Sequence, residues 1–505
     1  MNDQASPAVE PAPTAQVCSF CDKPVTAVNL LLAGHDAHIC DACVRTSMAV
    51  VAAKSGGRQF RLTHGLLQDH FAGLPPESIA ASSRVFPRRM RADLQRALQS
   101  ICLHRAAKTV GIHCTYQHES LRFSVLLEQG SDPKSIAPLQ YEDVDIGEAE
   151  PVRCLVNALV LAVADAMPVA VLVAHQFDYG EGAGINVEVA VPLGEDGAAF
   201  TRRFFNDLEH AVHAAQSYRG KVLSLEARRR FSGMSTGILV HKLRHVAREA
   251  VILPPATLDL LDQNIVQFAC VRDQLRALGM SAKKGLLFYG PPGTGKTHTV
   301  HYLASSLPDH TTLLVTAEQV GLLSEYFQLA RLLQPTIMVI EDADLIARDR
   351  QTMGSACEEV LLNQLLNEMD GLREDAEIFF ILTTNRPETL EAALAARPGR
   401  IDQAVEFPLP DAHCRRQLVR LYAANLQVSE QVSDTIVKRT EGVSASFIKE
   451  LMRRAAQYAI RAGAGNGVTP DHIEAALGEM LFTGGVLNAS LLGGAKTSEA
   501  FSGST

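Results

Sequence analysis

The sequence lacks an excess of basic residues. Its 505 residues include 47 lysines and arginines against 56 aspartates and glutamates, which gives a net charge of −9. Nucleic-acid-binding domains concentrate positive charge, so this composition argues against nucleic acid as the main partner. The chain also lacks the His-Glu-x-x-His motif, which excludes the zinc-protease chemistry that depends on that motif.

A secretion signal is missing from the start of the chain. Residues 1–15 are rich in proline and alanine, and they contain no basic stretch followed by an apolar core. We expect a disordered arm there. The chain has ten cysteines, but without an export signal a chain of this length is not expected to build a disulfide framework. These features predict a cytoplasmic protein.

Long apolar runs are scarce as well. The one candidate for a membrane span, residues 158–174, is short for a bilayer and contains Asp165 and Pro168. A buried helix over residues 152–166, followed by a strand over residues 169–174, explains this run better than a span does. We therefore expect no membrane-spanning segment, with the span kept as the alternative.

Two cysteine pairs open the part of the chain that carries recognisable motifs. Cys18-Ser-Phe-Cys21 is followed, after eighteen residues, by Cys40-Asp-Ala-Cys43. Two such knuckles can bring four thiolates to one tetrahedral Zn²⁺. The segment is too short to form a core alone, so the metal would supply its folding energy. Four reduced core cysteines, or a redox pair, are the alternatives to a zinc site.

The residues between the cysteines extend this pattern. Lys23, Val28, a Leu-Leu-Ala-Gly run at 31–34, and Ile39 accompany the four candidate ligands. Together they resemble the zinc-binding domain of the ClpX unfoldase. The resemblance implies a domain over residues 16–50 that dimerises and captures substrates or adaptors.

The most specific motif lies further along the chain. An apolar run at residues 285–289 precedes an eight-residue loop, and a helical pattern follows the loop. Glycines at such a turn let backbone N–H groups surround phosphates, and the helix N-terminus adds a favourable dipole. The lysine would reach the β- and γ-phosphates, and the last threonine would ligate Mg²⁺. This pattern predicts a nucleoside-triphosphatase, a glycine-containing tight turn being the alternative, and the loop comprises Gly290, Pro291, Pro292, Gly293, Thr294, Gly295, Lys296 and Thr297.

Polar residues end two buried strands that follow the loop. The apolar run 336–340 ends in Glu341 and Asp342, and the run 378–384 ends in Asn385. Parallel strands present such residues at their carboxyl ends, where nucleotides bind. One carboxylate would order the hydrated Mg²⁺ and the other would polarise the attacking water, while the amide would hold that water or the γ-phosphate.

These parts, in this order, resemble the AAA family between Gly285 and Asp411. The segments 363–372 and 383–387 and the turn Arg-Pro-Gly-Arg at 397–400 also occur where that family places them. The resemblance implies that the loop is the Walker A motif and binds ATP with Mg²⁺. Further implied roles are sensor 1 for Asn385, arginine fingers that act on a neighbouring subunit for Arg397 and Arg400, and contact beside the adenine for Ser444 and Ala445.

Two departures from the family affect the expected chemistry. AAA proteins mostly end the Walker B strand with Asp-Glu, whereas this chain has Glu341-Asp342, an order also seen in the mitochondrial complex-III-assembly AAA translocase. The metal role then falls to Glu341, with Thr297, and the water-activating role to Asp342. The second departure is Val-Gly-Leu-Leu at 320–323, where protein-threading relatives carry an aromatic-glycine pore loop. ATP hydrolysis is therefore the firmer expectation, and threading the weaker one.

The region between the zinc-binding segment and the loop predicts a mixed α/β domain. A helix starting at Phe86 would place Met90, Leu94, Leu98 and Ile101 on one face. The arginines of this stretch suggest a solvated helix face, with an anion or nucleic-acid patch as the alternative, and they are Arg84, Arg88, Arg89, Arg91 and Arg96. Strands are expected at 185–191 and 221–225, with a helix at 201–216 between them. No catalytic constellation is visible here.

The expected fold class is therefore α/β: an AAA ATPase domain with a parallel sheet flanked by helices, a helical lid, an α+β middle domain and a small zinc-binding domain. The chain is long enough for two to four domains. The predicted boundaries are a disordered arm at 1–15, the zinc-binding domain at 16–50, the middle domain at 60–225, a connector at 226–253, the ATPase subdomain at 254–410, the lid at 411–481 and a flexible tail at 482–505.

The function predicted from these parts is ATP-driven remodelling, unfolding or disassembly of protein substrates captured by the zinc-binding and middle domains. We expect a homo-oligomeric, hexameric ring with ATP, Mg²⁺ and Zn²⁺ as cofactors. The Ile-Gly-Phe tripeptide with which ClpX grips its peptidase is absent, so neither intrinsic proteolysis nor docking to that peptidase is expected. An ATP-switched assembly or regulatory factor and a DNA-associated ATPase are the alternatives.

Overall fold

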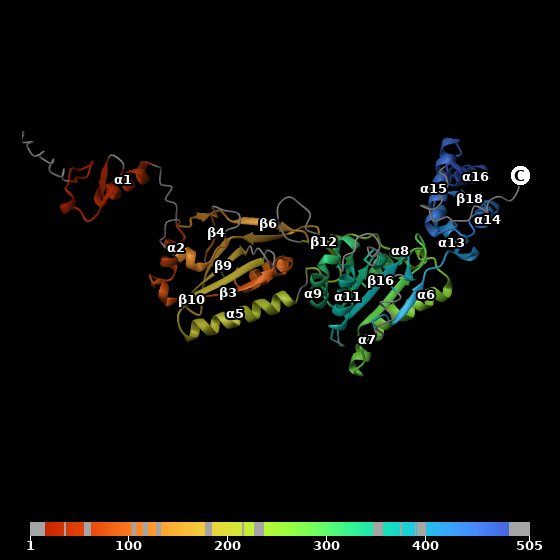
Figure 1. Cartoon of the computed structure of the whole chain (residues 1–505), viewed down its shortest axis with the longest axis horizontal. Helices are drawn as coiled ribbons and strands as arrows, with labels where there is room; N and C mark the ends of the chain where they lie inside the picture. Colours follow the sequence, from red (N-terminus) through yellow and green to blue (C-terminus); the bar gives the residue numbers. More distant parts are fainter. Residues whose placement is uncertain are drawn as a thin grey trace, which may run out of the picture.

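The computed structural model of the chain places its elements in four successive groups (Figure 1). These are a small cysteine-containing unit, a domain built on an antiparallel sheet, a domain built on a mainly parallel sheet, and a bundle of helices. The structure describes residues 16–34, 37–54, 62–103, 108–114, 120–127, 133–176, 184–214, 217–226, 237–346, 357–373, 376–388, 390 and 400–483.

The first unit is a short hairpin followed by a helix. Strands β1 (Leu31–Ala33) and β2 (His38–Cys40) pair antiparallel, and α1 (Asp41–Lys54) begins directly after β2. The 3-10 helix η1 (Val25–Ala27) precedes the hairpin. The large apolar side chains of this first unit are mostly exposed: Phe20 is 67% exposed and Leu30 is 55% exposed. The unit has almost no hydrophobic core, as its length predicts.

The second domain contains a six-stranded antiparallel sheet with the strand order β3-β10-β9-β8-β4-β5. Helices α3 (Arg91–Ile101) and α5 (Glu195–His213) pack on one face of the sheet, and α2 (Thr63–His70) and α4 (Phe123–Leu127) pack on the other. The strands are β3 (Ile79–Pro87), β4 (Lys108–Ile112), β5 (Ile136–Ala137), β8 (Ala158–Ala164), β9 (Met167–Gln176) and β10 (Gly184–Pro192). A separate hairpin joins β6 (Gln140–Val144) to β7 (Val152–Val156).

The helix predicted over residues 152–166 is wrong, because this stretch forms strands β7 and β8. All five residues from Ala158 to Ala162 are buried, so both faces of β8 are covered and the sequence shows no alternation. An apolar run of this kind does not distinguish a helix from a buried strand. Asp165 and Ala166 have φ of 50° and 64°, which builds the tight turn into β9 that a two-residue hairpin requires. The strands at 169–174 and 185–191 are confirmed as β9 and β10, and the predicted helix at 201–216 is confirmed as α5, which begins earlier, at Glu195, and ends at His213.

The predicted helix from Phe86 begins later, because Phe86 belongs to β3 and α3 starts at Arg91. The prediction that the arginines of this helix form a solvated face is also wrong in part. Arg91 is 4% exposed and contacts Glu142 at 2.7 Å, and Arg88 contacts the same carboxylate. The remaining partners are Glu209 for Arg84, Glu148 for Arg96 and, by a hydrogen bond, Gln328 for Arg89. Each arginine therefore has a partner within the chain, which removes the support for an anion-binding patch.

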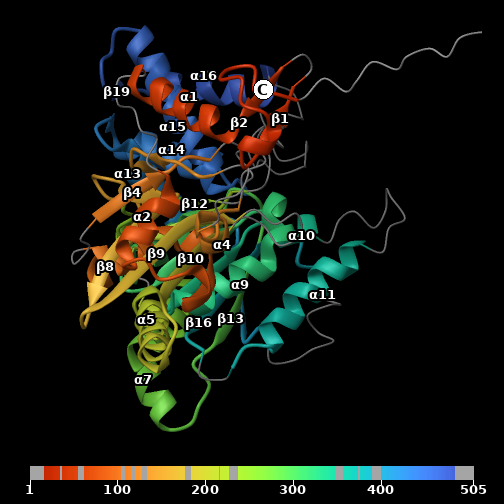
Figure 2. The same cartoon turned by 90° about the vertical axis from the view of Figure 1, so that its left-hand side faces the viewer.

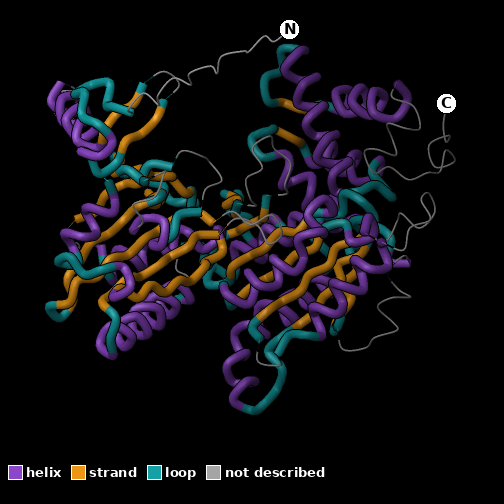
Figure 3. Tube along the Cα trace, turned by 60° about the vertical axis from the view of Figure 1, so that its left-hand side comes forward, coloured by secondary structure: helices purple, strands orange, loops and turns teal. Residues whose placement is uncertain are grey.

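The third domain is built on a seven-stranded sheet with the order β12-β11-β14-β15-β16-β13-β17. All neighbours pair parallel except β11 and β12. Helices α9 and α11 pack on one face and α6, α7 and α8 on the other. Figure 2 shows α9 and α11 on the side of β13 and β16 away from α7, and Figure 3 shows helices packed beside the strands of the sheet. The central strands are β13 (Lys284–Tyr289), β14 (Thr311–Val315), β15 (Thr336–Ile340), β16 (Ile378–Thr384) and β17 (Gln403–Glu406), and the helices are α6 (Pro255–Leu261), α7 (Phe268–Ala277), α8 (Lys296–Ser306), α9 (Leu323–Leu332), α10 (Ala343–Ile346) and α11 (Cys357–Asp370).

At one edge of this sheet, the last two strands, β11 and β12, come from residues that we assigned to the middle domain and the connector. The strand predicted at 221–225 is β11 (Val222–Leu225), and it pairs with β14 rather than with the antiparallel sheet. Strand β12 (Ile238–His241) pairs with β11. The Tyr326 hydroxyl accepts from Leu225 N at 2.8 Å. The assignment of residues 221–225 to the middle domain is thus wrong, because the strand joins the sheet of the next domain. The sequence of so short a strand does not indicate which sheet it pairs with.

The fourth group is a helical bundle that follows β17. It contains α13 (Ala412–Ala423), α14 (Glu430–Arg439), α15 (Ala445–Arg461) and α16 (Pro470–Gly478), with the short strands β18 (Gln427–Val428) and β19 (Gly467–Val468) pairing between them. Its own core includes Ile436, Leu451 and Ile473. In the parts of the chain that the structure describes, no helix has the length and apolar character needed to cross a bilayer.

Candidate functional site

The phosphate-binding loop has the strand–loop–helix context that its sequence predicts. Strand β13 ends at Tyr289, and α8 begins at Lys296. Gly293 and Gly295 have φ of 77° and 104°, a left-handed backbone that glycine adopts without strain. A Cβ on Gly293 would lie 2.0 Å from the Ser446 hydroxyl oxygen. The loop therefore needs glycine here both for its backbone and for the close approach of α15.

Lys296 lies at the centre of this loop and is 7% exposed. Its ammonium donates to Gly290 O at 2.8 Å, to Pro291 O at 3.0 Å and to Asn385 Oδ1 at 2.8 Å. Burial lowers its pKa to about 8, although the nearby carboxylates of Asp342 and Asp344 act in the opposite direction. An ammonium held here by neutral acceptors is ready to exchange two carbonyls for phosphate oxygens.

The carboxyl ends of β15 and β16 meet beside Lys296, as their sequence predicts. Asn385, at the end of β16, donates through Nδ2 to Asp342 Oδ1 at 3.2 Å while it accepts from Lys296. The Asp342 backbone N–H donates to Thr383 Oγ1 at 3.1 Å. Asp342 has φ of 48°, an uncommon conformation for a residue that is not glycine. Lysine, amide and carboxylate thus form one hydrogen-bonded line across the end of the sheet.

Glu341 and Asp342 face different surroundings, although they are neighbours in the chain. Asp342 is exposed on the side of Lys296 and Asn385, whereas Glu341 is half-buried. Glu341 acts on the ring of His301, whose pKa burial lowers and the Glu341 charge raises. Thr297 is exposed at the first turn of α8. The two carboxylates are therefore not equivalent, and their separate roles remain a proposal.

Sequence reasoning missed Asp344, which is 3% exposed at the start of α10. Its Oδ1 accepts from Thr384 Oγ1 at 2.9 Å and from Asn385 N at 3.3 Å. This carboxylate fixes the backbone on which the Asn385 side chain is mounted. The signal was present in the sequence, since an acid two residues beyond Asp342 follows a buried strand and needs a partner when it is buried.

The helical bundle contacts the loop through α15. Ser444 caps this helix by accepting from Phe447 N at 3.3 Å, and its hydroxyl oxygen lies 2.9 Å from that of Ser446. The residue that reaches the loop is Ser446, whose backbone N–H donates to Gly293 O at 3.1 Å. Ala445 packs against the bundle core. Ser444 and Ala445 thus build the start of α15, and the backbone hydrogen bond to the loop comes from the next residue of the same segment, Ser446.

The two predicted arginine fingers have different outcomes. Arg397 lies outside the described residues. Arg400 is 6% exposed, and its Nε donates to Asp370 Oδ1 at 2.8 Å at the end of α11. A second bond joins Arg400 Nη2 to Asp370 Oδ2, and Nη1 has no hydrogen-bond partner among the described residues. In the single chain this guanidinium is therefore paired with a carboxylate of its own domain.

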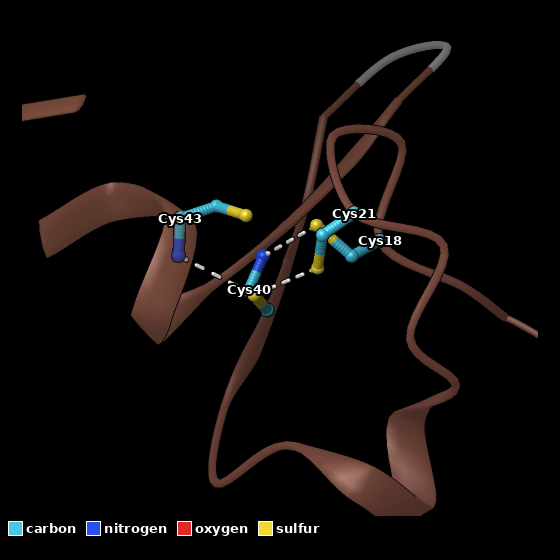
Figure 4. Close-up of side chains that lie close together, drawn as sticks. All are labelled: Cys18, Cys21, Cys40 and Cys43. Carbon is cyan, nitrogen blue, oxygen red and sulfur yellow. Dashed lines mark hydrogen bonds between the residues drawn. The ribbon is translucent and has the colours of Figure 1, made fainter. Parts of the chain in front are cut away.

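The four cysteines of the first unit converge as their spacing predicts (Figure 4). The sulfur atoms of Cys18, Cys21, Cys40 and Cys43 all lie within 4.8 Å of one another, and those of Cys21 and Cys40 are 3.7 Å apart. Zn–S bonds of ~2.3 Å in a tetrahedron place neighbouring sulfurs about 3.8 Å apart. The arrangement fits one Zn²⁺ and does not fit four separate core thiols.

Backbone N–H groups of the two knuckles favour the thiolate of Cys18, whereas burial and the neighbouring cysteine sulfurs raise the pKa of Cys21 and of Cys43. The Cys40 N–H points to Cys18 Sγ at 3.2 Å, and the Cys43 N–H points to Cys40 Sγ at 3.4 Å. Burial opposes ionisation of Cys18, but N–H groups of Phe20, Cys40 and Cys21 outweigh it and lower its pKa to about 6. A thiolate is the form that binds zinc.

We expect the purified chain to contain one zinc ion, which Cys18→Ser removes. The metal would supply roughly 10–16 kcal/mol of folding free energy, and the unit has little core to replace it. Metal analysis and limited proteolysis of residues 16–54 measure both effects. The control is Cys270→Ser, which changes an exposed cysteine of α7. Metal-free wild-type protein, or an equally protease-resistant Cys18→Ser variant, would contradict the zinc assignment.

Comparison with known proteins shows that the segments forming these two sites each match a known family. Residues 286–409 match the ATPase family associated with various cellular activities (AAA), and residues 16–53 match the ClpX C4-type zinc finger. Both resemblances expected from the sequence, and the α/β fold class with its parallel sheet, are confirmed. The expected cofactors ATP, Mg²⁺ and Zn²⁺ agree with these families.

Several curated relatives align with the AAA region. The 26S proteasome regulatory subunit 10B homolog A of Arabidopsis thaliana is 33% identical over 197 residues, which cover 37% of this chain and 49% of the relative. Subunit 10B of Dictyostelium discoideum is 34% identical over 197 residues, with coverage of 37% and 50%. The subunit 6B homolog of Aspergillus niger is 33% identical over 250 residues, with coverage of 47% and 56%. The chain spans about half the length of these relatives.

These matches coincide with the phosphate loop and its sheet, and with the four-cysteine centre. The chain therefore contains an AAA domain and a ClpX-type C4 zinc finger.

Proposed function

We propose that this chain is an ATPase that uses hydrolysis to remodel or disassemble other proteins. The observation that carries the proposal is the line from Lys296 through Asn385 to Asp342, at the mouth of a phosphate-binding loop. The aligned proteasome regulatory subunits support the AAA assignment of this region.

In the proposed reaction Lys296 binds the β- and γ-phosphates, and the N–H groups of residues 290–297 surround them. Thr297 and Glu341 would hold Mg²⁺, which neutralises phosphate charge when bound. Asp342 orients and polarises the attacking water, and Asn385 positions that water or the γ-phosphate. These roles use the exposure of Asp342 toward Lys296 and the half-buried place of Glu341.

We place the nucleotide base between the sheet domain and the helical bundle. Val251 and Leu253 pack into the sheet-domain core, while Ile252 packs against the bundle core. Ser444 and Ala445 begin α15 beside this segment in the proposal, and Ser446 connects it to the loop through Gly293. Closure of the bundle on the base would then move the phosphate loop directly, through the contact between Ser446 and Gly293.

We propose a ring in which Arg397 and Arg400 serve the nucleotide of a neighbouring subunit. The alignment with subunits of a larger assembly supports oligomer formation. We propose that the ring contains six copies of this chain. In that ring Arg400 must exchange Asp370 for the partner's phosphate. Within the described part of the chain Nη1 of Arg400 has no hydrogen-bond partner and Asp370 is the one carboxylate that pairs with it, which leaves the guanidinium with donors for this exchange.

The second candidate is an ATP-switched assembly or regulatory factor that does not thread its clients. Residues 320–323, where threading relatives carry their pore loop, lie in η7 (Ala317–Leu322) and at the start of α9. Val320 and Leu323 are 3% and 0% exposed. These side chains serve the core and are unavailable for gripping a polypeptide, so disassembly by conformational switching is favoured over threading. The DNA-associated alternative loses its support with the pairing of the arginine cluster. We also propose a cytoplasmic location.

The test is ATP turnover with and without unfolded protein. We expect basal hydrolysis that rises with a permanently unfolded client such as carboxymethylated α-lactalbumin if remodelling is the function. A switch would show ATP-dependent partner binding with no stimulation by the client. The Asp342→Asn variant should retain ATP and client together, so a pull-down with this variant would identify the partner protein. That partner is then used to measure ATP-dependent binding. Absence of ATP hydrolysis by the zinc-loaded, oligomeric chain under all conditions would refute the proposal.

A further inference from the structure

The middle domain contains a cavity that the proposed ATPase chemistry does not use. It has a volume of about 590 Å³ and lies between α2, α4 and strands β3 and β10. Its wall is mainly apolar, with Leu67, Leu74, Ile79, Phe123 and Leu127 among its residues. A cavity of this size and character accommodates a large side chain or a small ligand.

The register of the sheet explains why this space is not filled. Ala81 of β3 pairs with Ala190 of β10, and Ser83 pairs with Glu188. Paired residues of antiparallel strands share one face of the sheet, so small side chains gather on the face that α2 and α4 cover. Ala190 belongs to the core beneath those helices. The helices therefore rest on neighbouring larger residues, and a hollow remains over β3.

Among the described residues that line this cavity, Glu188 is the only acidic one, and it is 7% exposed. Its Oε2 accepts from Phe123 N at 2.9 Å. Burial raises its pKa, while the Phe123 N–H and the exposed Arg122 act in the opposite direction. Among the residues that the structure describes, no basic side chain forms an ion pair with Glu188. His64, also in the wall, has a buried Nδ1 that finds no hydrogen-bond partner in the described residues. An apolar cavity with an unpaired carboxylate favours a cationic guest.

Strand β3 beside the cavity is an edge strand. It stands at the end of the sheet order, and β10 is its one neighbour among the described strands. Five consecutive residues, Ala81 to Val85, are exposed. Such an edge presents unpaired N–H and C=O groups to which an extended chain can add as a further strand. Alternate side chains of that added strand would point to the same face as Ala81 and Ser83, where the cavity opens.

We propose that the middle domain binds an extended polypeptide along β3, with a lysine or arginine side chain inserted into the cavity toward Glu188. Lysine and arginine combine an aliphatic stem, which suits the apolar wall, with a cation for the carboxylate. The edge strand favours a polypeptide over a free amine, because a free amine leaves the backbone groups of β3 unused. As the client-capture site of an ATPase this role rests on the proposed function, but the binding itself requires no nucleotide.

The experiment uses the full-length, zinc-loaded chain without nucleotide and fluorescein-labelled octapeptide pools. Each pool fixes one central residue, lysine, arginine, norleucine or glutamate, and randomises the others. We expect fluorescence polarisation to show tighter binding of the lysine and arginine pools. Glu188→Gln keeps the acceptor for Phe123 N–H but loses the charge, and should weaken these two pools roughly tenfold or more. Asp207→Asn, which removes an exposed acid of α5, should leave binding unchanged.

Two further measurements separate the parts of this site. Ala81→Leu fills the mouth of the cavity from an exposed strand position and should abolish the preference for lysine and arginine. Peptides from the lysine pool with N-methylated alternate amides should bind more weakly if they add to β3. Equal binding of all pools, unchanged binding by Glu188→Gln, or equal competition by n-butylamine and N-methylated peptide would each overturn the proposal. Because ATP turnover is measured separately, absence of peptide binding by the unmodified chain with normal turnover refutes this site alone, and peptide binding by the unmodified chain without ATP turnover refutes the ATPase proposal alone.

Discussion

Arg400→Ala is expected to lower ATP turnover by roughly 10³–10⁵-fold, the range found when an arginine finger is absent. ATP binding should persist, because the proposed finger stabilises charge that develops in the transition state on a neighbouring subunit. The measurements are steady-state hydrolysis and nucleotide affinity on the same oligomeric preparation. Turnover per chain should also rise steeply with protein concentration as rings form.

The pair between Arg400 and Asp370 requires a matched control. Asp370→Asn removes the charge that holds the guanidinium within its own domain but leaves the proposed finger intact. If Arg400 has a purely structural role, both variants should be unstable and inactive. If Arg400 is an arginine finger, Asp370→Asn should be far more active than Arg400→Ala.

Mixing provides the second check on the finger. Rings made from Arg400→Ala and Lys296→Ala chains should regain part of the turnover, since an intact finger on one chain can serve the intact loop of the other. Flat specific activity across the transition from monomer to oligomer, together with normal hydrolysis by Arg400→Ala, would exclude the finger role.

Asp342→Asn is expected to reduce turnover by about 10²–10⁴-fold, the usual contribution of a group that accepts a proton in the transition state. The variant should retain ATP affinity, because the asparagine can still meet Asn385 and no ground-state phosphate contact is lost. Lys296→Ala should behave differently and lose affinity, since its ammonium contacts phosphate before reaction. Rapid-quench turnover with equilibrium binding of a fluorescent ATP analogue distinguishes these two results.

Glu341→Gln is the matched comparison for this residue. If Glu341 holds Mg²⁺, its variant should require more Mg²⁺ for half-maximal turnover, whereas Asp342→Asn should show the parental Mg²⁺ dependence. Hydrolysis at the parental rate by Asp342→Asn would transfer the water-activating role to Glu341 and reverse our assignment of the Glu-Asp pair.

The phosphate loop and the zinc centre could be predicted from sequence because their chemistry depends on fixed local spacing. Gly293, Gly295 and Lys296 build their site within a few residues, and each Cys-x-x-C pair supplies two ligands from one turn. The partners that arrive from elsewhere were harder to foresee. Ser446 reaches Gly293 from another domain, and Arg400 pairs with Asp370 across the sheet domain. Such contacts depend on tertiary packing that no spacing encodes.

The middle domain was the least predictable part for a related reason. Residues 158–162 are covered on both faces of the sheet, which removes the alternation that identifies a strand. Arg91 looked like part of a solvated stretch because its partner, Glu142, lies on a distant hairpin. The cavity beside Glu188 likewise depends on which strand lies next to β10, and this is a property of topology rather than of pattern.

The place of β11 in the parallel sheet affects the biosynthesis of the chain. Its partner β14 follows the whole phosphate loop in sequence, so the ribosome releases the antiparallel domain well before β11 can pair with that strand. N-terminal domains commonly fold first during synthesis. Strands β11 and β12 can pair with each other at once, but the β14 side of this hairpin stays open until residues 311–315 emerge. During that interval the nascent chain exposes a strand edge of the kind that chaperones protect and that aggregation exploits.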